Sequence, residues 1–184
     1  IFYNKVLTKD ENMTKKVIVA GVGMIPFKKP GASENYNVMG EKAARAALED
    51  AGLDYKLVQQ AYVGYVYGDS TAGQAALYGV GLSGIPIFNV NNYCSTGSSA
   101  LFLARQAVQS GTIDCAIALG FEQMTPGALD ILFEDRPNPL MRFYDEMTSL
   151  QGFDESVPWA AQFFGGAGKE LSLIHISEPT RLRS

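Results

Sequence analysis

The spacing of apolar and polar residues along the chain predicts strands and helices in alternation. An apolar run at residues 17–27 predicts a buried strand that ends in a turn. Residues 38–51 place alanine and leucine on one helical face, and Gly52 follows as a helix stop. The same alternation then predicts strands at 61–67, 86–90 and 113–121 and helices at 74–82 and 95–110. Strands that alternate with helices indicate an α/β layered domain with a mostly parallel sheet.

The alternation stops after residue 121. Residues 122–164 contain four prolines, and charged residues gather between Glu134 and Arg142. This pattern predicts a long loop excursion over the surface, of the kind that often shapes a binding site.

The two ends of the chain do not continue the pattern. Residues 1–12 precede Met13 and have neither the apolar core of a signal peptide nor the arginine-rich character of a transit peptide. Residues 171–184 look like translated vector sequence, and they contain His175, the single histidine of the chain. We therefore expect one domain over residues 13–170 between two non-native ends.

Composition narrows the range of functions. A hydrophobic content of 47% in 184 residues indicates a globular domain with a sizeable core. The net charge of -4, without a basic block, argues against nucleic-acid binding, and the longest apolar stretches are too short to span a membrane. Two cysteines do not form a disulfide framework and fit a reducing compartment. One histidine does not supply a metal site, so we expect no metal.

Cys94 is the candidate nucleophile. It follows an apolar run and opens the helix predicted at 95–110. Unpaired amide groups and the helix dipole at such a position favour the thiolate over the thiol. Cysteine is also among the most buried residue types and is usually inert packing. The polar residues around it, Asn91, Asn92, Ser95 and Thr96, balance that tendency, so the residues alone leave both interpretations open.

Three other features favour structural interpretations. Residues 21–23 read Gly-Val-Gly after a strand, but the third glycine of a dinucleotide-binding fingerprint is missing. Residues 68–70 read Gly-Asp-Ser after a strand, but serine-hydrolase chemistry needs a histidine with an acidic partner. Cys115 lies within an apolar strand and is expected in the core.

The segment from Asn91 to Leu101 resembles the nucleophile motif of the thiolase family, in particular the SCP2-thiolase type. The resemblance covers about Thr14 to Glu170. Further stretches agree in order and spacing at 19–24, 63–71, 118–124 and 164–170.

The resemblance implies a fold and an activity. This chain would form the N-terminal half of the αβαβα thiolase fold. Cys94 would accept the acyl group from a 3-oxoacyl-CoA and pass it to CoA, and Met124 would lie near the acyl pocket. Coenzyme A is then a substrate, and no cofactor is needed. Family members of this type act in the β-oxidation of fatty acids and branched-chain lipids in peroxisomes. They are usually homodimers.

The chain also departs from the family pattern. The Gly-His-Pro and Cys-x-Gly motifs of the second thiolase half are absent from these residues. We therefore expect these 184 residues to be inactive in thiolysis and to leave an apolar face uncovered, which promotes aggregation. Two alternatives stay open: a related condensing enzyme that forms carbon–carbon bonds, and a non-catalytic lipid-binding protein that keeps the fold.

Overall fold

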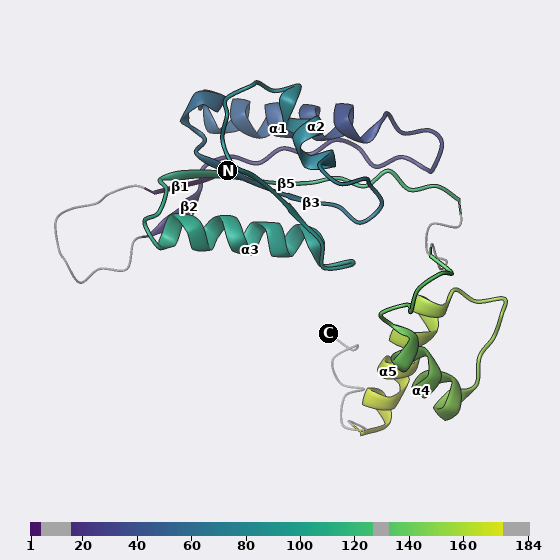
Figure 1. Ribbon diagram of the computed structural model, residues 1–184. Helices are drawn as coiled ribbons and strands as arrows, with labels where there is room; N and C mark the ends of the chain where they lie inside the picture. The colour runs from purple at the N-terminus through teal and green to yellow at the C-terminus, as the bar shows by residue number, and fades with distance from the viewer. Residues whose placement is uncertain (5–15, 127–132, 175–184) are drawn as a thin grey trace, which may run out of the picture. The chain divides into compact units, whose positions relative to one another are not determined.

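The computed structural model describes residues 1–4, 16–126 and 133–174. The chain divides into two compact units, Ile1–Pro126 and Gly127–Ser184, and each is described by itself. The first unit carries a five-stranded sheet, and the second carries a pair of helices (Figure 1). In the described residues no helix is both long enough and apolar enough to cross a bilayer.

The sheet of the first unit is built on three parallel strands. Strands β3 (Gln60–Gly64), β4 (Ile87–Val90) and β5 (Cys115–Gly120) run parallel, with β3 in the middle. Two short strands extend the sheet beyond β5 in antiparallel pairs: β1 (Phe2–Asn4) and then β2 (Val17–Val19). The strand order is therefore β2-β1-β5-β3-β4.

Helices cover both faces of this sheet (Figure 1). One face carries α1 (Tyr36–Ala51) and α2 (Ala72–Tyr78), and the other carries α3 (Thr96–Gln109). A short 3₁₀ helix, η1 (Tyr55–Leu57), precedes β3. The prediction of an α/β layered domain with a mostly parallel sheet is confirmed.

The core divides between the two faces because successive strand side chains point to opposite sides. Ile117 packs with Ala44 and Leu48 on the α1 side, whereas its neighbour Ala116 packs with Ala104 on the α3 side. The apolar strand around residue 115 is therefore covered on both faces, as the sequence predicted. Cys115 is buried at 2% exposure, which confirms its place in the core, and burial raises the pKa of its thiol.

The strand predicted at 17–27 is wrong beyond Val19, where β2 ends. The two glycines of the Gly-Val-Gly segment lie against the backbone of α1 instead. A Cβ at Gly21 would collide with the carbonyl oxygen of Ala47, and one at Gly23 with that of Ala43. The glycines therefore serve close packing of the chain on a helix.

Residues 2–4, to which the sequence pattern assigns no element, form β1 between β2 and β5. Phe2 is 5% exposed and lies opposite Ala116 in the sheet register. A three-residue strand carries too little periodicity to be recognised from sequence.

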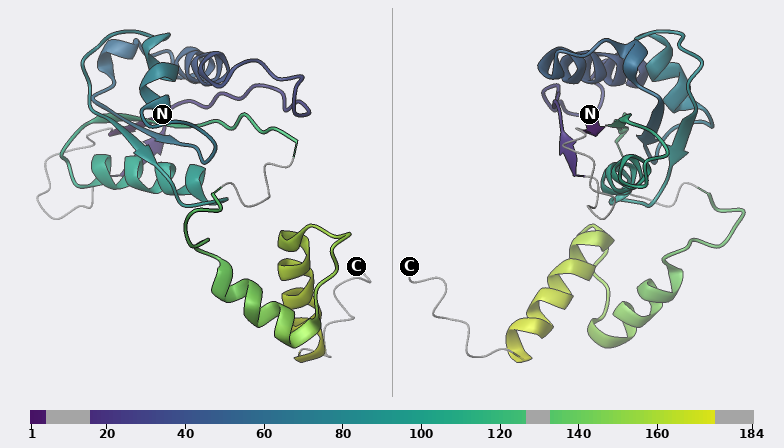
Figure 2. Two further views of the ribbon diagram at one scale, coloured as in Figure 1. Left: turned by 45° about the vertical axis from the view of Figure 1, so that its right-hand side comes forward. Right: turned by 90° about the vertical axis from the view of Figure 1, so that its left-hand side faces the viewer.

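The second unit holds two helices, α4 (Met141–Gln151) and α5 (Trp159–Ile174), which pack on each other (Figure 2). The loop excursion predicted at 122–164 therefore contains α4 and the start of α5. One of its prolines, Pro158, directly precedes α5, and proline suits the start of a helix. Helix α5 continues past residue 170 to Ile174. His175 lies outside the described residues.

One glutamine ties the connection between α4 and α5. The Gln162 side-chain amide donates to the carbonyl oxygens of Asp154 and Val157 at 2.9 Å and 2.7 Å. Its carbonyl oxygen accepts from the Asp154 N–H at 3.0 Å. These three bonds fix the loop that follows Gly152, where the chain turns back.

Candidate functional site

Cys94 lies in the turn between β4 and α3, two residues before Thr96, the first helical residue. Its side chain is exposed and its thiol is free. The packing interpretation that the sequence left open for Cys94 is therefore wrong. A cysteine at the start of a helix, open to solvent, has the access that a nucleophile needs.

The turn around Cys94 is tightly bent. Tyr93 has a φ of 51°, in the left-handed region that is uncommon for a residue with a Cβ. The Ser95 hydroxyl donates to the Asn92 carbonyl oxygen at 2.8 Å, and the Asn92 side-chain amide donates to the Ser99 hydroxyl at 2.9 Å. Side chains on both sides of Cys94 thus hold the bend against the first turn of α3.

Two glycines bring the start of α3 close to the sheet. Gly64 and Gly120, the last residues of β3 and β5, lie opposite each other in the parallel register. A Cβ at Gly64 would stand 2.7 Å from the Thr96 methyl carbon, and one at Gly120 would stand 3.9 Å from the Gly97 Cα. Sequence reasoning missed this pair. A glycine inside each of the two predicted strands, at 61–67 and 113–121, is the signal that could have found it.

The outer face of α3 is open in the first unit. Leu101 is 51% exposed and Phe102 is 59% exposed, whereas Ala100, Ala104 and Val108 on the opposite side are buried against the sheet. The apolar residues that surround this helix in the sequence are therefore covered on one side only. This agrees with the expectation of an uncovered apolar face.

The structure places Met124 in a cavity that Cys94 does not line. This cavity has a volume of about 600 Å³ and lies among the segment after β2, the first turns of α1 and the end of β5. Its apolar lining residues include Met24, Phe27, Met39, Phe121 and Met124. The two residues that the sequence singled out are thus not brought into one cavity.

An ion pair stands among the residues that line this cavity. Lys42 Nζ lies 2.6 Å from Glu34 Oε1, and this hydrogen bond holds the pKa of the Glu34 carboxyl below its usual range. The exposed Lys42 and Glu34 give one part of an otherwise apolar cavity a polar character.

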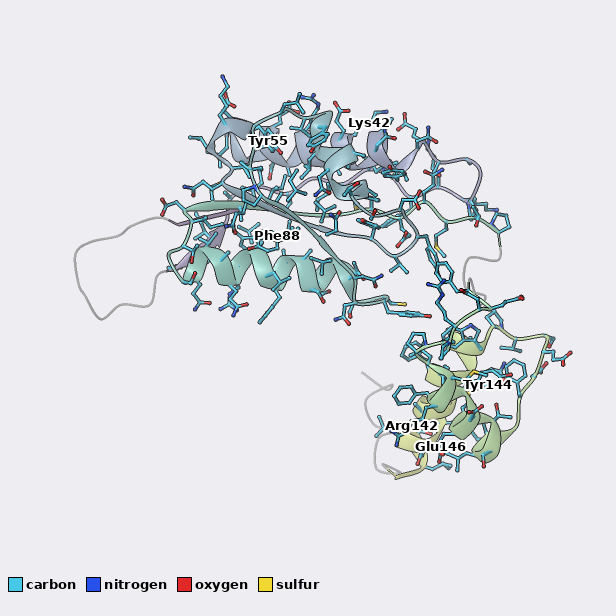
Figure 3. All side chains as sticks on the ribbon, in the orientation of Figure 1. Lys42, Tyr55, Phe88, Arg142, Tyr144 and Glu146 are labelled. Atoms are coloured by element: carbon cyan, nitrogen blue, oxygen red, sulfur yellow. The ribbon has the colours of Figure 1, made fainter. Side chains whose placement is uncertain are left out.

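Figure 3 shows Lys42 on the α1 side of the sheet and Phe88 on the α3 side. The Phe88 ring stacks on the Tyr62 ring, and the two ring centroids are 5.2 Å apart.

The segment that carries Met124 is anchored at the end of the sheet by Glu122. The two Glu122 carboxylate oxygens accept from the Val66 and Tyr67 N–H groups at 3.0 Å and 2.9 Å. Phe121 stacks between Tyr36 and Tyr65, with ring centroids 5.2 Å from each. Sequence reasoning missed this anchor because a glutamate after a strand gives no sign of a partner 55 residues away.

The other motifs weighed from the sequence have structural roles. The Gly-Asp-Ser segment at 68–70 leads into α2, and the Tyr65 hydroxyl donates to the Asp69 carbonyl oxygen at 3.0 Å. Within residues 1–4, 16–126 and 133–174, no three side chains of histidine, cysteine, aspartate or glutamate gather as metal ligands would.

Comparison with known proteins gives consistent matches. Residues 17–133 match the family described as thiolase, N-terminal domain. Sterol carrier protein 2 from Bos taurus is 49% identical over 160 residues, which is 86% of this chain and 29% of that protein. Non-specific lipid-transfer protein-like 2 from Caenorhabditis elegans is 46% identical over 160 residues, covering 84% of this chain and 39% of that protein.

A third relative is more distant. The peroxisomal 3-ketoacyl-CoA thiolase of Encephalitozoon cuniculi is 30% identical over 87 residues, covering 45% of this chain and 22% of that protein. The chain thus spans well under half the length of each of these relatives.

Proposed function

The chain belongs to the thiolase family, and we propose that Cys94 is the acyl-accepting nucleophile of a thiolase-type transferase. The family match confirms the resemblance read from the residues around Cys94, which lie inside the matched range of 17–133. The observation that carries the proposal is the exposed, free thiol of Cys94 in a bent turn at the start of α3.

The proposed reaction proceeds in two transfers. The Cys94 thiolate attacks the 3-keto carbon of a 3-oxoacyl-CoA, and the carbon–carbon bond next to that carbon breaks. The departing acetyl-CoA carbanion takes up a proton, and the acyl group stays on sulfur as a thioester. The thiolate of a second CoA then attacks this thioester and releases a shortened acyl-CoA with free Cys94. A thiolate suits both steps because it is a good nucleophile and a good leaving group.

Amide groups next to Cys94 would stabilise the negative oxygen of each tetrahedral intermediate. One such donor typically contributes roughly 3–4 kcal/mol to the transition state. The N–H groups of Asn92, Tyr93, Ser95 and Thr96 are already hydrogen-bonded within the turn, so we propose the Cys94 N–H as this donor. We also propose that Met124 contacts the acyl chain, which the apolar lining of its cavity supports; because Cys94 does not line this cavity, the acyl chain would have to extend from the sulfur to reach it.

The similarity to two of the relatives supports a proposal for the substrate class and location. We propose a role in peroxisomal lipid β-oxidation, which the similarity to sterol carrier protein 2 and to a peroxisomal 3-ketoacyl-CoA thiolase supports. We propose acyl-CoA and CoA as partners and a homodimer as the complete assembly. A related condensing enzyme would use the same cysteine in the direction of bond formation.

One alternative has an observation in its favour. The similarity to non-specific lipid-transfer protein-like 2 supports a lipid-binding role. A protein of that kind would hold an acyl chain without a covalent bond to Cys94.

Acyl transfer to Cys94 tests the proposal. The chain is incubated with acetyl-CoA and its intact mass is measured, followed by peptide mapping. We expect one acetyl group on Cys94, released again by added CoA. This exchange between thioesters breaks no carbon–carbon bond, so it is a separate reaction from the thiolysis of a 3-oxoacyl-CoA in which these residues alone are expected to be inactive. The variant Cys94→Ser should stay unmodified, and Cys115→Ser should be acetylated like the original chain. Binding of a fatty acid by an unmodified chain would support the lipid-binding alternative and contradict the proposal.

A further inference from the structure

Among the residues that the structure describes, Thr96 is a polar residue that is buried, with an exposed fraction of 4%. Its hydroxyl is used twice. It accepts a hydrogen bond from the Asn92 N–H at 2.8 Å, and it donates a hydrogen bond to the Tyr93 carbonyl oxygen. Both partners precede Cys94 in the chain and Thr96 follows it, so one hydroxyl closes the turn that presents Cys94.

This hydroxyl, together with the Thr96 N–H that donates to the same Tyr93 carbonyl oxygen at 3.1 Å, fixes the peptide group that joins Tyr93 to Cys94. A trans peptide group is planar, and its C=O and N–H point in opposite directions. Because the Tyr93 carbonyl is held toward Thr96, the Cys94 N–H must point away from Thr96. The same bonds stabilise the left-handed conformation of Tyr93, which a residue with a Cβ seldom adopts without support.

The Thr96 side chain is itself held in place by the sheet. Its methyl carbon lies where a Cβ at Gly64 would approach to 2.7 Å, so the end of β3 is packed directly against it. A β-branched side chain has few χ1 rotamers, and this packing restricts Thr96 further. The rigid end of the sheet therefore sets the position of the hydroxyl, and the hydroxyl sets the turn.

We propose that Thr96 is a positioning residue for Cys94. It orients the Cys94 N–H and sulfur so that acyl transfer can proceed, without touching the substrate itself. This inference rests on the proposed function for its catalytic consequence, whereas the geometric part stands independently of it.

Two variants separate the hydroxyl from the rest of the side chain. Thr96→Val keeps the shape and removes both hydrogen bonds. Thr96→Ser keeps the hydroxyl and removes the methyl group. Both are made in the full chain with Cys115→Ser, so that a label on cysteine reports Cys94 alone. Circular dichroism during thermal unfolding checks that each variant folds.

The first measurement reads the position of Cys94 directly. With ¹⁵N-labelled cysteine, the Cys115→Ser chain gives a single amide resonance. We expect this resonance to stay sharp in Thr96→Ser and to broaden or split in Thr96→Val, because the turn then samples several conformations. A sharp, unchanged resonance in a folded Thr96→Val chain would overturn the proposal.

The second measurement compares two reactions of the Cys94 sulfur. Acetyl transfer from acetyl-CoA needs an oriented N–H donor, whereas alkylation by iodoacetamide at high pH needs none. Loss of one such donor typically costs about 10²-fold, so a misdirected donor in Thr96→Val should slow acetyl transfer by about tenfold or more. Alkylation should keep its rate, and Thr96→Ser should retain both reactions.

The outcomes of the two measurements are distinguishable. Equal acetyl transfer in Thr96→Val and the parent chain would overturn the inference and leave the proposed function intact. If the parent chain is not acetylated at all, the proposed function fails, and the amide resonance still decides whether Thr96 positions Cys94. Equal slowing of acetyl transfer and alkylation would indicate general disruption and count against the inference.

Discussion

Gly64 and Thr96 meet where the end of β3 touches the first residue of α3, and no side-chain atom fits between them. A Cβ on Gly64 would approach the Thr96 methyl carbon to 2.7 Å and the Thr96 carbonyl oxygen to 2.8 Å. The second of these atoms belongs to the backbone, so it cannot move without moving the helix. The packing of one glycine thus sets how closely α3 and the turn before it approach the sheet.

Gly64→Ala should therefore destabilise the first unit and displace the turn that holds Cys94. Overpacking of this kind typically lowers the free energy of unfolding by about 1–3 kcal/mol. Urea unfolding followed by circular dichroism measures it. Gly97→Ala is the matched control, because Gly97 lies in α3 with nothing within 4 Å of an added Cβ. Alanine there should raise the free energy of unfolding by about 0.5–1 kcal/mol. Equal effects of the two variants would refute this account of the packing.

The two cysteines should differ sharply in reactivity. Cys94 is exposed and Cys115 is buried, and burial raises the pKa of the Cys115 thiol so that less thiolate is present. A disulfide reagent such as DTNB at pH 8 should react rapidly with one thiol and reach the second only after denaturation. Cys94→Ser should remove the rapid phase, whereas Cys115→Ser should keep it. Two rapid thiols in the folded chain would contradict the burial of Cys115.

The raised pKa of Cys115 also predicts how stability depends on pH. The thiol has an ordinary value of 9.0 and a higher value in the folded chain, mainly because burial disfavours the thiolate. Between these two values the folded state binds more protons than the unfolded state, so the free energy of unfolding falls as pH rises above 9. Cys115→Ala should flatten this fall, and Cys94→Ala should not. If the free energy of unfolding of Cys115→Ala fell with the same slope, the fall would be due to titratable groups other than Cys115, and the prediction would be wrong.

Glu122 should contribute strongly to the stability of the sheet end. Its two oxygens accept from two backbone N–H groups, and glutamine offers only one accepting oxygen. Glu122→Gln leaves one N–H facing another donor, which typically costs about 1–3 kcal/mol in the free energy of unfolding. Glu49→Gln, at an exposed position on α1, is the control and should change stability little. The Glu122 anchor would be disproved if both variants unfolded at the same urea concentration.

The open face of α3 should promote self-association. Phe102 and Leu101 are both more than half exposed on neighbouring positions of this helix. Phe102→Gln should reduce aggregation while leaving stability nearly unchanged, because a polar side chain is compatible with an exposed helical site. Gln106→Ala, exposed on the same helix, is the control and should aggregate like the original chain. Light scattering at several concentrations measures the difference, and a parent chain that is already a stable monomer would contradict the prediction.

Long periodic segments made the core of the fold predictable. The helix at 38–51 and the strand at 113–121 carry enough apolar positions at one period to specify both the element and its buried face. Their observed counterparts, α1 and β5, agree to within a few residues, as does α3. The run at 17–27 was misread because its glycines look like part of an apolar strand, whereas they serve a close contact with α1.

The site was predictable only in part, for a related reason. Cys94 stands out through its neighbours along the chain, and its exposure agrees with a nucleophile. The contacts that hold its turn join residues from separate elements, such as Gly64 and Thr96, and no local pattern encodes them. Glu122 is similar, because its partners lie in the segment that follows β3. Local sequence points to Cys94 as the candidate nucleophile, whereas tertiary packing determines how its turn is supported.

The central claim is that Cys94 carries an acyl group between CoA molecules. The most direct measurement is the mass of the peptide that contains Cys94 after the folded chain has been treated with acetyl-CoA and rapidly digested at low pH. We predict an acetyl thioester on Cys94 that disappears when free CoA is added before digestion. An unmodified Cys94 in a chain whose thiol still reacts with iodoacetamide would contradict the claim.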